Sequence, residues 1–151
     1  MSQLIIYTDG SSRGNPGPGG YGAVLQWGTT SKELSQGYKL TTNNRMEMMG
    51  VIAAMESLTR EGLDIIIYTD SAYIVNSVEK KWVFGWEKKG YAGKKNADLW
   101  ARFLRLYRKH KVKFVWVKGH ANNVYNNRCD VLATQAADSG KWLEDVGYDK
   151  E

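Results

Sequence analysis

The sequence predicts an α/β fold in which a five-stranded mixed sheet is flanked by helices. The 151 residues correspond to one domain of ordinary size. Hydrophobic residues make up 42% of the chain and charged residues 25%, a composition typical of globular domains. The order of the patterns indicates the class, because strand-like runs come first and helix and strand patterns then alternate. We therefore expect residues 1–151 to form a single domain.

Three strand-like segments begin the chain and predict an antiparallel meander. Residues 4–8 are β-branched and aromatic, and a glycine-rich loop is expected over residues 10–22. Residues 21–27 and 33–40 follow as two further strands, joined by a turn at residues 28–30.

The middle of the chain predicts a parallel crossover. Apolar residues recur at helical spacing from Met46 to Leu58, after the cap-type residues 41–44. Residues 65–69 are a continuous apolar run, which is typical of a strand buried on both faces. A strand, a helix and a strand in this order predict a right-handed connection.

A basic segment separates this unit from the last elements. We expect a basic protrusion at about residues 80–97, an amphipathic helix ending near His110, a strand over 112–117, a helix over 126–137, and an acidic tail that is partly flexible.

The charge is unevenly distributed along the chain. The net charge is +5, from 21 basic and 16 acidic residues. Residues 80–118 contain 13 basic and 2 acidic residues, a net +11, whereas the remaining residues sum to −6. Basic residues interleaved with tryptophans suit a nucleic-acid backbone. A solvated helix face with ordinary core tryptophans is the alternative interpretation. By their helical and strand periodicity, Trp100 and Trp116 are expected in the core.

The composition also excludes several classes of protein. The single cysteine, Cys129, cannot form an intramolecular disulfide, which favours a cytoplasmic location. With only His110 and His120 beside it, the sequence argues against a tetrahedral zinc site. Neither a signal peptide nor a run of about 18 apolar residues is recognisable, so we expect no membrane association.

Two identical strings, IIYTD, end at Asp9 and at Asp70. Ligand sites in open α/β sheets form beyond the carboxyl ends of the strands, so these two carboxylates could lie side by side. Each aspartate taken alone is better explained as a turn or N-cap residue.

Two further acids extend this set. Glu47 stands three residues after Asn44, where a capping box is the alternative interpretation. Asp130 follows Cys129 on the last predicted helix, where a solvated carboxylate is the alternative. Clustered carboxylates remain ionised only beside a cation, and oxygen ligands select Mg²⁺ first and Mn²⁺ second. Two such ions can activate water against a phosphodiester.

Six blocks of sequence occur in order along nearly the whole chain. They read YTDGS (7–11), GNPGPGGYG (14–22), TTNNRME (41–47), TDS (69–71), VKGH (117–120) and RCD (128–130). Together these blocks closely resemble bacterial type 1 ribonuclease H. The resemblance implies the ribonuclease H fold and an endonuclease that hydrolyses the RNA strand of RNA–DNA hybrids without sequence specificity, leaving 5′-phosphate and 3′-hydroxyl ends.

The resemblance also implies roles for individual residues. Asp9, Glu47, Asp70 and Asp130 would bind two Mg²⁺ ions, with Asp9 shared between them. His120 would accept or relay a proton as an auxiliary catalytic residue. The substrate-binding residues expected from the basic segment and the Asn-rich loops are Trp82, Trp86, Lys88, Lys89, Lys94, Lys95, Asn15, Thr42, Asn43 and Asn44.

The expected partner is therefore an RNA–DNA hybrid duplex, bound by a monomer. Three alternatives remain: a junction resolvase or transposase-type nuclease, a noncatalytic hybrid-binding module, and a Mg²⁺-dependent small-molecule phosphatase. The four acids argue against the binding module, and the phosphatase leaves the basic segment unexplained.

Overall fold

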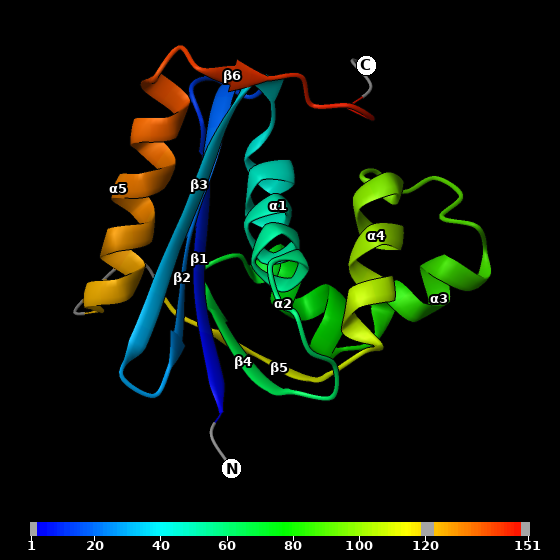
Figure 1. Ribbon diagram of the computed structural model, residues 1–151. Coiled ribbons are helices and arrows are strands. Elements are labelled where there is room, and N and C mark those ends of the chain that lie inside the picture. Colours follow the sequence, from blue (N-terminus) through cyan, green and yellow to red (C-terminus); the bar gives the residue numbers. More distant parts are fainter. Residues whose placement is uncertain (1–2, 119–122, 149–151) are drawn as a thin grey trace.

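The computed structural model describes residues 3–118 and 123–148, in which six strands form one mixed sheet with the order β5-β4-β1-β2-β3-β6 (Figure 1). The strands are β1 (Leu4–Ser12), β2 (Gly17–Trp27), β3 (Thr30–Thr41), β4 (Asp64–Thr69), β5 (Lys111–Trp116) and β6 (Trp142–Leu143). The first three strands pair antiparallel, whereas β4 pairs parallel with β1 and with β5. The predicted meander and the parallel crossover are both confirmed.

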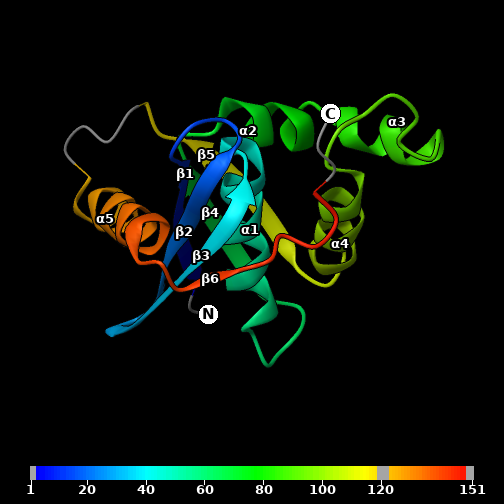
Figure 2. The ribbon, with the colours of Figure 1, turned by 90° about the horizontal axis from the view of Figure 1, so that it is seen from above.

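Five helices flank the sheet. They are α1 (Asn43–Glu56), α2 (Ala72–Glu79), α3 (Trp82–Lys88), α4 (Ala97–Tyr107) and α5 (Val124–Asp138). The sheet separates α5 from α1, and α4 packs on α1 (Figures 1 and 2). The main hydrophobic core lies between the sheet and the α1 side. Among the described residues, no helix has both the length and the apolar character that a membrane span requires.

The glycine-rich segment is mostly strand rather than loop. β1 continues to Ser12 and β2 begins at Gly17, so the connection is only residues 13–16. The reason is close packing, because a Cβ at Gly20 or Gly22 would collide with the backbone of α5. These glycines let the helix lie directly on the sheet.

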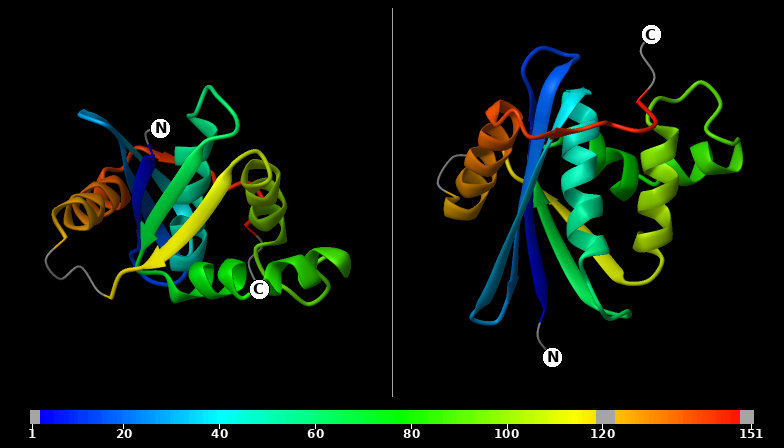
Figure 3. Two further views of the ribbon diagram at one scale, coloured as in Figure 1. Left: turned by 90° about the horizontal axis from the view of Figure 1, so that it is seen from below. Right: turned by 45° about the horizontal axis from the view of Figure 1, so that its top comes forward.

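The sixth strand was not predicted, since a five-stranded sheet was expected. β6 is two residues long and pairs parallel with Gly37 and Tyr38 of β3. So short a strand carries no alternating pattern that a sequence reading could detect. From β6 the chain runs across the top of the molecule toward α4, as the right view of Figure 3 shows.

The two tryptophans expected in the core differ. Trp100 is 1% exposed and packs within the main cluster, as predicted. Trp116 is 49% exposed, so its assignment to the core was wrong. It is the last residue of β5, an outer strand of the sheet, where little covers the ring.

Candidate active site

The two identical strings lie beside each other in the sheet. β1 and β4 are parallel neighbours, and their register pairs Tyr7 with Tyr68. Asp9 and Asp70 therefore stand at the same level, although β4 ends at Thr69 while β1 continues past Asp9 to pair with β2. Asp9 is only 3% exposed. Parallel pairing of the two strings is what brings these carboxylates together.

The third carboxylate, Glu47, comes from the first turns of α1. A Cβ at Gly10 would collide with the backbone of Met46 and Glu47, so this glycine allows α1 to rest on β1 directly beside Asp9. One carboxylate oxygen from each of Asp9, Glu47 and Asp70 lies within 4.8 Å of the other two.

Neither capping alternative describes these acids. The N-cap of α1 is Thr42, whose Oγ1 accepts a hydrogen bond from the backbone N–H of Arg45 (3.3 Å), so Glu47 stands too far along the helix for a capping box. The N-cap of α2 is Ser71, whose Oγ accepts from the N–H of Ile74 (3.2 Å). Both helices thus have an N-cap side chain other than the two acids. Asp9 makes a local turn contact, to the N–H of Gly10 (2.9 Å).

The cluster is electrostatically suited to a cation. Burial, and then the neighbouring Asp9 and Asp70, raise the pKa of the Glu47 carboxyl well above its ordinary value. Glu47 Oε1 is buried and has no hydrogen-bond partner among the described residues. An all-oxygen donor set with a buried, unsatisfied oxygen fits a hard divalent metal ion.

The fourth predicted acid, Asp130, lies on α5 near this cluster but outside it. Gly22 pairs with Asp9, and a Cβ on Gly22 would stand 2.5 Å from the carbonyl oxygen of Cys129. α5 therefore crosses the sheet at the level of Asp9. Asp130 is half-buried and does not belong to the group of described carboxylates within 4.8 Å of one another. The predicted catalytic His120 lies outside the described residues.

The four polar residues predicted to contact substrate are gathered at the top of β1 and the start of α1. Asn43 donates its N–H to Asn15 Oδ1 (3.1 Å), and Asn43 Oδ1 accepts from the N–H of Ser12 (2.8 Å). With Thr42 and Asn44 they line a groove of about 720 Å³. Lys94 and Lys95 line the same groove, although they are some fifty positions away in sequence.

The other predicted substrate residues lie on the basic segment outside that groove. Trp82 is 48% exposed, with the Lys80 ammonium 5.3 Å from its ring centroid. Trp86 instead packs edge-on against the core residue Trp100 at 6.0 Å, and Lys94 lies over it at 5.0 Å. Lys88 and Lys89 are exposed. The basic segment therefore combines Trp86, which is anchored to the core, with a half-exposed Trp82 and lysines that face solvent.

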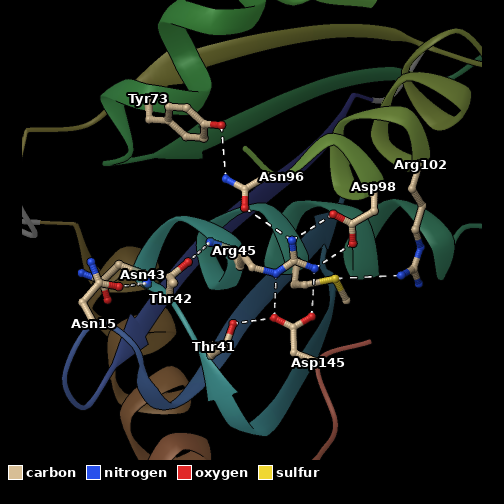
Figure 4. A network of polar contacts seen from close by, with 11 residues as sticks. Asn15, Thr41, Thr42, Asn43, Arg45, Tyr73, Asn96, Asp98, Arg102 and Asp145 are labelled. Atoms are coloured by element: carbon tan, nitrogen blue, oxygen red, sulfur yellow. Dashed lines mark hydrogen bonds and ion pairs between the residues drawn. The ribbon is translucent and has the colours of Figure 1, made fainter. Parts of the chain in front are cut away.

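Sequence reasoning missed two features near the site. The indole N–H of Trp116 donates to the backbone carbonyl of Asp70 (3.2 Å), which ties the end of β5 to the segment that carries this acid. Arg45 is a buried residue of the groove lining and is held in a network of ion pairs (Figure 4). The only local signal is an arginine next to the inward-facing Met46, and its partners are 53 and 100 residues away.

Known proteins resemble this chain over its whole length. The family model for RNase H matches residues 1–138. The ribonuclease H of Syntrophus aciditrophicus (strain SB) is 50% identical over 155 residues, covering 98% of this chain and 88% of that protein. The ribonuclease H of Pectobacterium atrosepticum is 50% identical over 154 residues, covering 99% and 98%.

Solved structures show the same likeness in three dimensions. LC9-RNase H1, described as a type 1 RNase H with the type 2 active-site motif, gives a TM-score of 0.83 at 30% identity, covering 98% of this chain and 79% of that one. LC11-RNase H1 in complex with an RNA/DNA hybrid gives 0.71 at 26% identity, covering 91% and 99%. By sequence and by structure, the chain belongs to the ribonuclease H family.

Proposed function

We propose that this chain is an endonuclease that hydrolyses the RNA strand of RNA–DNA hybrids without sequence specificity. The observation that carries the proposal is the convergence of Asp9, Glu47 and Asp70 in a chain of the ribonuclease H family. The relatives named above are ribonucleases H, and LC11-RNase H1 was solved with a hybrid bound.

Asp9, Glu47 and Asp70 are the proposed metal ligands, and Asp130 is the proposed fourth. Two Mg²⁺ ions, for which Mn²⁺ can substitute, would lower the pKa of a water and stabilise the charge that develops on the leaving oxygen. What supports this assignment is the oxygen-only donor set and the unsatisfied Oε1 of Glu47. The ligands themselves are rigidly placed by β1, β4 and α1, which reduces the reorganisation needed during reaction.

The reaction is a hydrolysis at phosphorus. The water oxygen forms a new bond to phosphorus while the bond from phosphorus to the ribose 3′ oxygen breaks. One strand end then carries the 5′-phosphate, and the other takes a proton to become a 3′-hydroxyl. His120 is the proposed auxiliary group for moving a proton near the water or the product.

Selection of RNA requires contacts in the wide minor groove, where the 2′-hydroxyls are displayed. Asn15, Asn43 and Asn44 offer both donors and acceptors at the rim of the groove beside the carboxylates, and Thr42 is a candidate for a DNA phosphate. The exposed lysines of residues 80–97 are proposed to bind the phosphates of the DNA strand. Such contacts are independent of sequence and weaken with salt.

We also propose that the chain acts as a monomer in the cytoplasm. Its single cysteine, Cys129, is buried and free, which suits a reducing compartment.

The test is cleavage of a hybrid whose two strands are labelled in turn, in Mg²⁺. We expect the RNA strand alone to be cut, with 5′-phosphate ends, and double-stranded DNA, four-way junctions and phosphomonoesters to remain intact. Asp70→Asn is the matched negative control. Cleavage of the DNA strand, or equal cleavage of a four-way junction, would instead support a nuclease of different specificity.

A further inference from the structure

We propose that Arg45 is a positioning residue that, clamped by Asp98 and Asp145, holds the two walls of the substrate groove at a set spacing. The inference rests on the proposed function, because it assigns a role in holding the hybrid. It gives the C-terminal segment, residues 142–148, a part in substrate binding through Asp145.

The clamp satisfies every donor of the Arg45 guanidinium (Figure 4). Nε donates to Asp145 (2.7 Å) and Nη2 to both Asp145 (3.0 Å) and Asp98 (2.7 Å). Nη1 donates to Asp98 (2.9 Å) and to Asn96 Oδ1 (3.4 Å). The five N–H groups of an arginine form a rigid planar fork, so two bidentate carboxylates fix its position as well as its charge.

The partners of Arg45 come from the different walls of the groove. Arg45 itself belongs to the first turn of α1 and follows Thr42, Asn43 and Asn44, which line one wall. Asn96 and Asp98 follow Lys94 and Lys95, which line the opposite wall. Arg45 is therefore the cross-link between the asparagine-rich wall and the lysine wall.

The C-terminal segment completes the clamp. Asp145 also accepts a hydrogen bond from Thr41 Oγ1 (2.6 Å), so it is fixed to the end of β3. Gly147 and Tyr148 form part of the groove lining, and the Tyr148 ring lies 5.9 Å from the Arg45 guanidinium carbon. A segment that begins beyond α5 thus closes one side of the groove.

Burial distinguishes this cluster from the other arginine ion pairs that the described residues make. The Arg45 and Asp145 side chains are 2% and 4% exposed, and Asp98, the second partner of this buried arginine, is 39% exposed. The pairs Arg13–Asp138, Arg102–Glu56, Arg108–Glu87 and Arg128–Glu33 have side chains that are all at least 35% exposed. Exposed pairs are loosely held, whereas a buried pair cannot separate without leaving an unpaired charge. Arg45 is therefore fixed to Asp145 by burial, and its two hydrogen bonds to Asp98 connect it to the lysine wall.

The network also reaches the segment after Asp70. Asn96 Nδ2 donates to the hydroxyl of Tyr73 on α2 (3.3 Å), and so does the indole N–H of Trp100 (2.9 Å). The lysine wall is thus held against both α1 and α2, the helices that begin beside the carboxylates.

The experiment measures hybrid cleavage and binding in Asp98→Asn, at the more exposed partner of Arg45 (39%), and in Asp145→Asn. We expect KM to rise about 3- to 10-fold and kcat to change less than about twofold, because the walls lose their spacing while the carboxylates stay in place. The salt dependence of hybrid binding should also become shallower, by about one phosphate contact.

Combined variants distinguish a positioning role of the clamp from a merely stabilising one. Combining Asp98→Asn with Lys94→Ala and Lys95→Ala should cost less than the separate effects on KM predict, since the displaced wall already loses those contacts. Combination with Lys88→Ala and Lys89→Ala, which lie outside the groove, should be additive. A buried control, Leu4→Ala at the far end of β1, should lower the melting temperature without raising KM.

The outcomes are distinguishable. The positioning role would be overturned if KM rose with the loss of melting temperature equally in Leu4→Ala and Asp98→Asn. It would also be overturned if the effects on KM of Asp98→Asn and of the Lys94→Ala and Lys95→Ala replacements were fully additive. If Asp145→Asn does not fold, the Asp98→Asn series alone decides. Failure of the unmodified chain to cut or bind a hybrid would refute the proposed function itself.

Discussion

The carboxylate site and the basic segment of residues 80–97 differ in the sign of their charge and in how far their charged side chains are buried. Asp9, Glu47 and Asp70 are repelling charges crowded against the sheet, held by two parallel strands and a helix that rests on a glycine. The lysines of the basic segment are exposed, and Val83 with the rings of Phe84, Trp86 and Tyr91 anchors the segment to the core. In the first region the carboxylates repel one another, and a bound metal ion would reduce that repulsion. In the second region exposed lysines can bind the phosphates of a nucleic acid of any sequence.

This difference implies a division of labour. Substitutions at the acids should act on the chemical step, whereas substitutions at the lysines should act on binding and its salt dependence. Variants of each region test whether catalysis and binding separate in this way.

The largest effect is expected from Asp70→Asn. Loss of a metal ligand removes several kcal/mol of transition-state stabilisation, or about 10³-fold and more in kcat at 1.36 kcal/mol per tenfold. Hybrid affinity should change only a few-fold, because the lysines are untouched. Single-turnover cleavage and fluorescence anisotropy measure the two quantities. Near-normal turnover at saturating Mg²⁺ would refute the assignment of Asp70.

Neutralising the basic segment should give the converse result. We expect the combined replacement of Lys88, Lys89, Lys94 and Lys95 by alanine to raise KM about tenfold or more and to reduce the salt slope by roughly 3, with a smaller change in kcat.

A matched set removes four exposed lysines elsewhere, Lys32, Lys39, Lys111 and Lys113, with the same change in net charge. An equal loss of affinity in both sets would mean that total charge, and not the basic segment, holds the substrate.

The charge on Glu47 should destabilise the metal-free native state. The pKa of Glu47 is raised by burial and by its acidic neighbours, so the native state binds a proton more readily than the unfolded chain. Stability is therefore lost as pH rises from the ordinary carboxyl pKa, about 4.3, toward the raised native pKa. In EDTA at pH 7, Glu47→Gln should melt a few degrees higher than the unmodified chain, and the gain should vanish below about pH 4.

Glu33 provides a control of opposite sign, because the hydrogen bond from Arg128 lowers the pKa of its carboxyl. Glu33→Gln should leave the melting temperature unchanged or slightly lower. Mg²⁺ should raise the melting temperature of the unmodified chain and not of Glu47→Gln. Destabilisation of the metal-free protein by Glu47→Gln would contradict the repulsion described here.

The smallest effect is expected in the reactivity of the buried thiol of Cys129, which reports on opening of the structure around β1. Burial raises the pKa of the Cys129 thiol to about 12, and its Sγ lies 3.2 Å from the carbonyl oxygen of Tyr7, two residues before Asp9 on β1. The native thiol should not react with a disulfide reagent except when the protein unfolds. A cysteine introduced at the exposed Ala92, in the variant Ala92→Cys, should react within seconds. Similar labelling rates at Cys129 and at Ala92→Cys would contradict the view that the carboxylate site is more rigid than the basic segment.

Local patterns predicted much of this molecule. The two IIYTD strings indicated buried strands whose aspartates meet, and the structure pairs them in register. The helical spacing after residues 41–44 indicated α1, although its start at Asn43 removes Glu47 from the capping position. Where the pattern was periodic and continuous, the element and its approximate ends could be read.

Contacts between distant segments were beyond the sequence. The exposure of Trp116 depends on its place on an outer strand, and β6 depends on a parallel pairing about a hundred residues away. The role of Arg45 depends on Asp98 and Asp145, none of which stands out by spacing. Such features follow from packing, which a single sequence does not reveal.

The central claim is that Asp9, Glu47 and Asp70 hold divalent metal. The most direct test is a crystal of the protein soaked in Mn²⁺, with an anomalous difference map. We expect a peak within about 2–2.5 Å of carboxylate oxygens from these three residues, and the same map would show whether a second ion contacts Asp130. Absence of any peak among the three carboxylates, at a Mn²⁺ concentration that supports cleavage in solution, would contradict it.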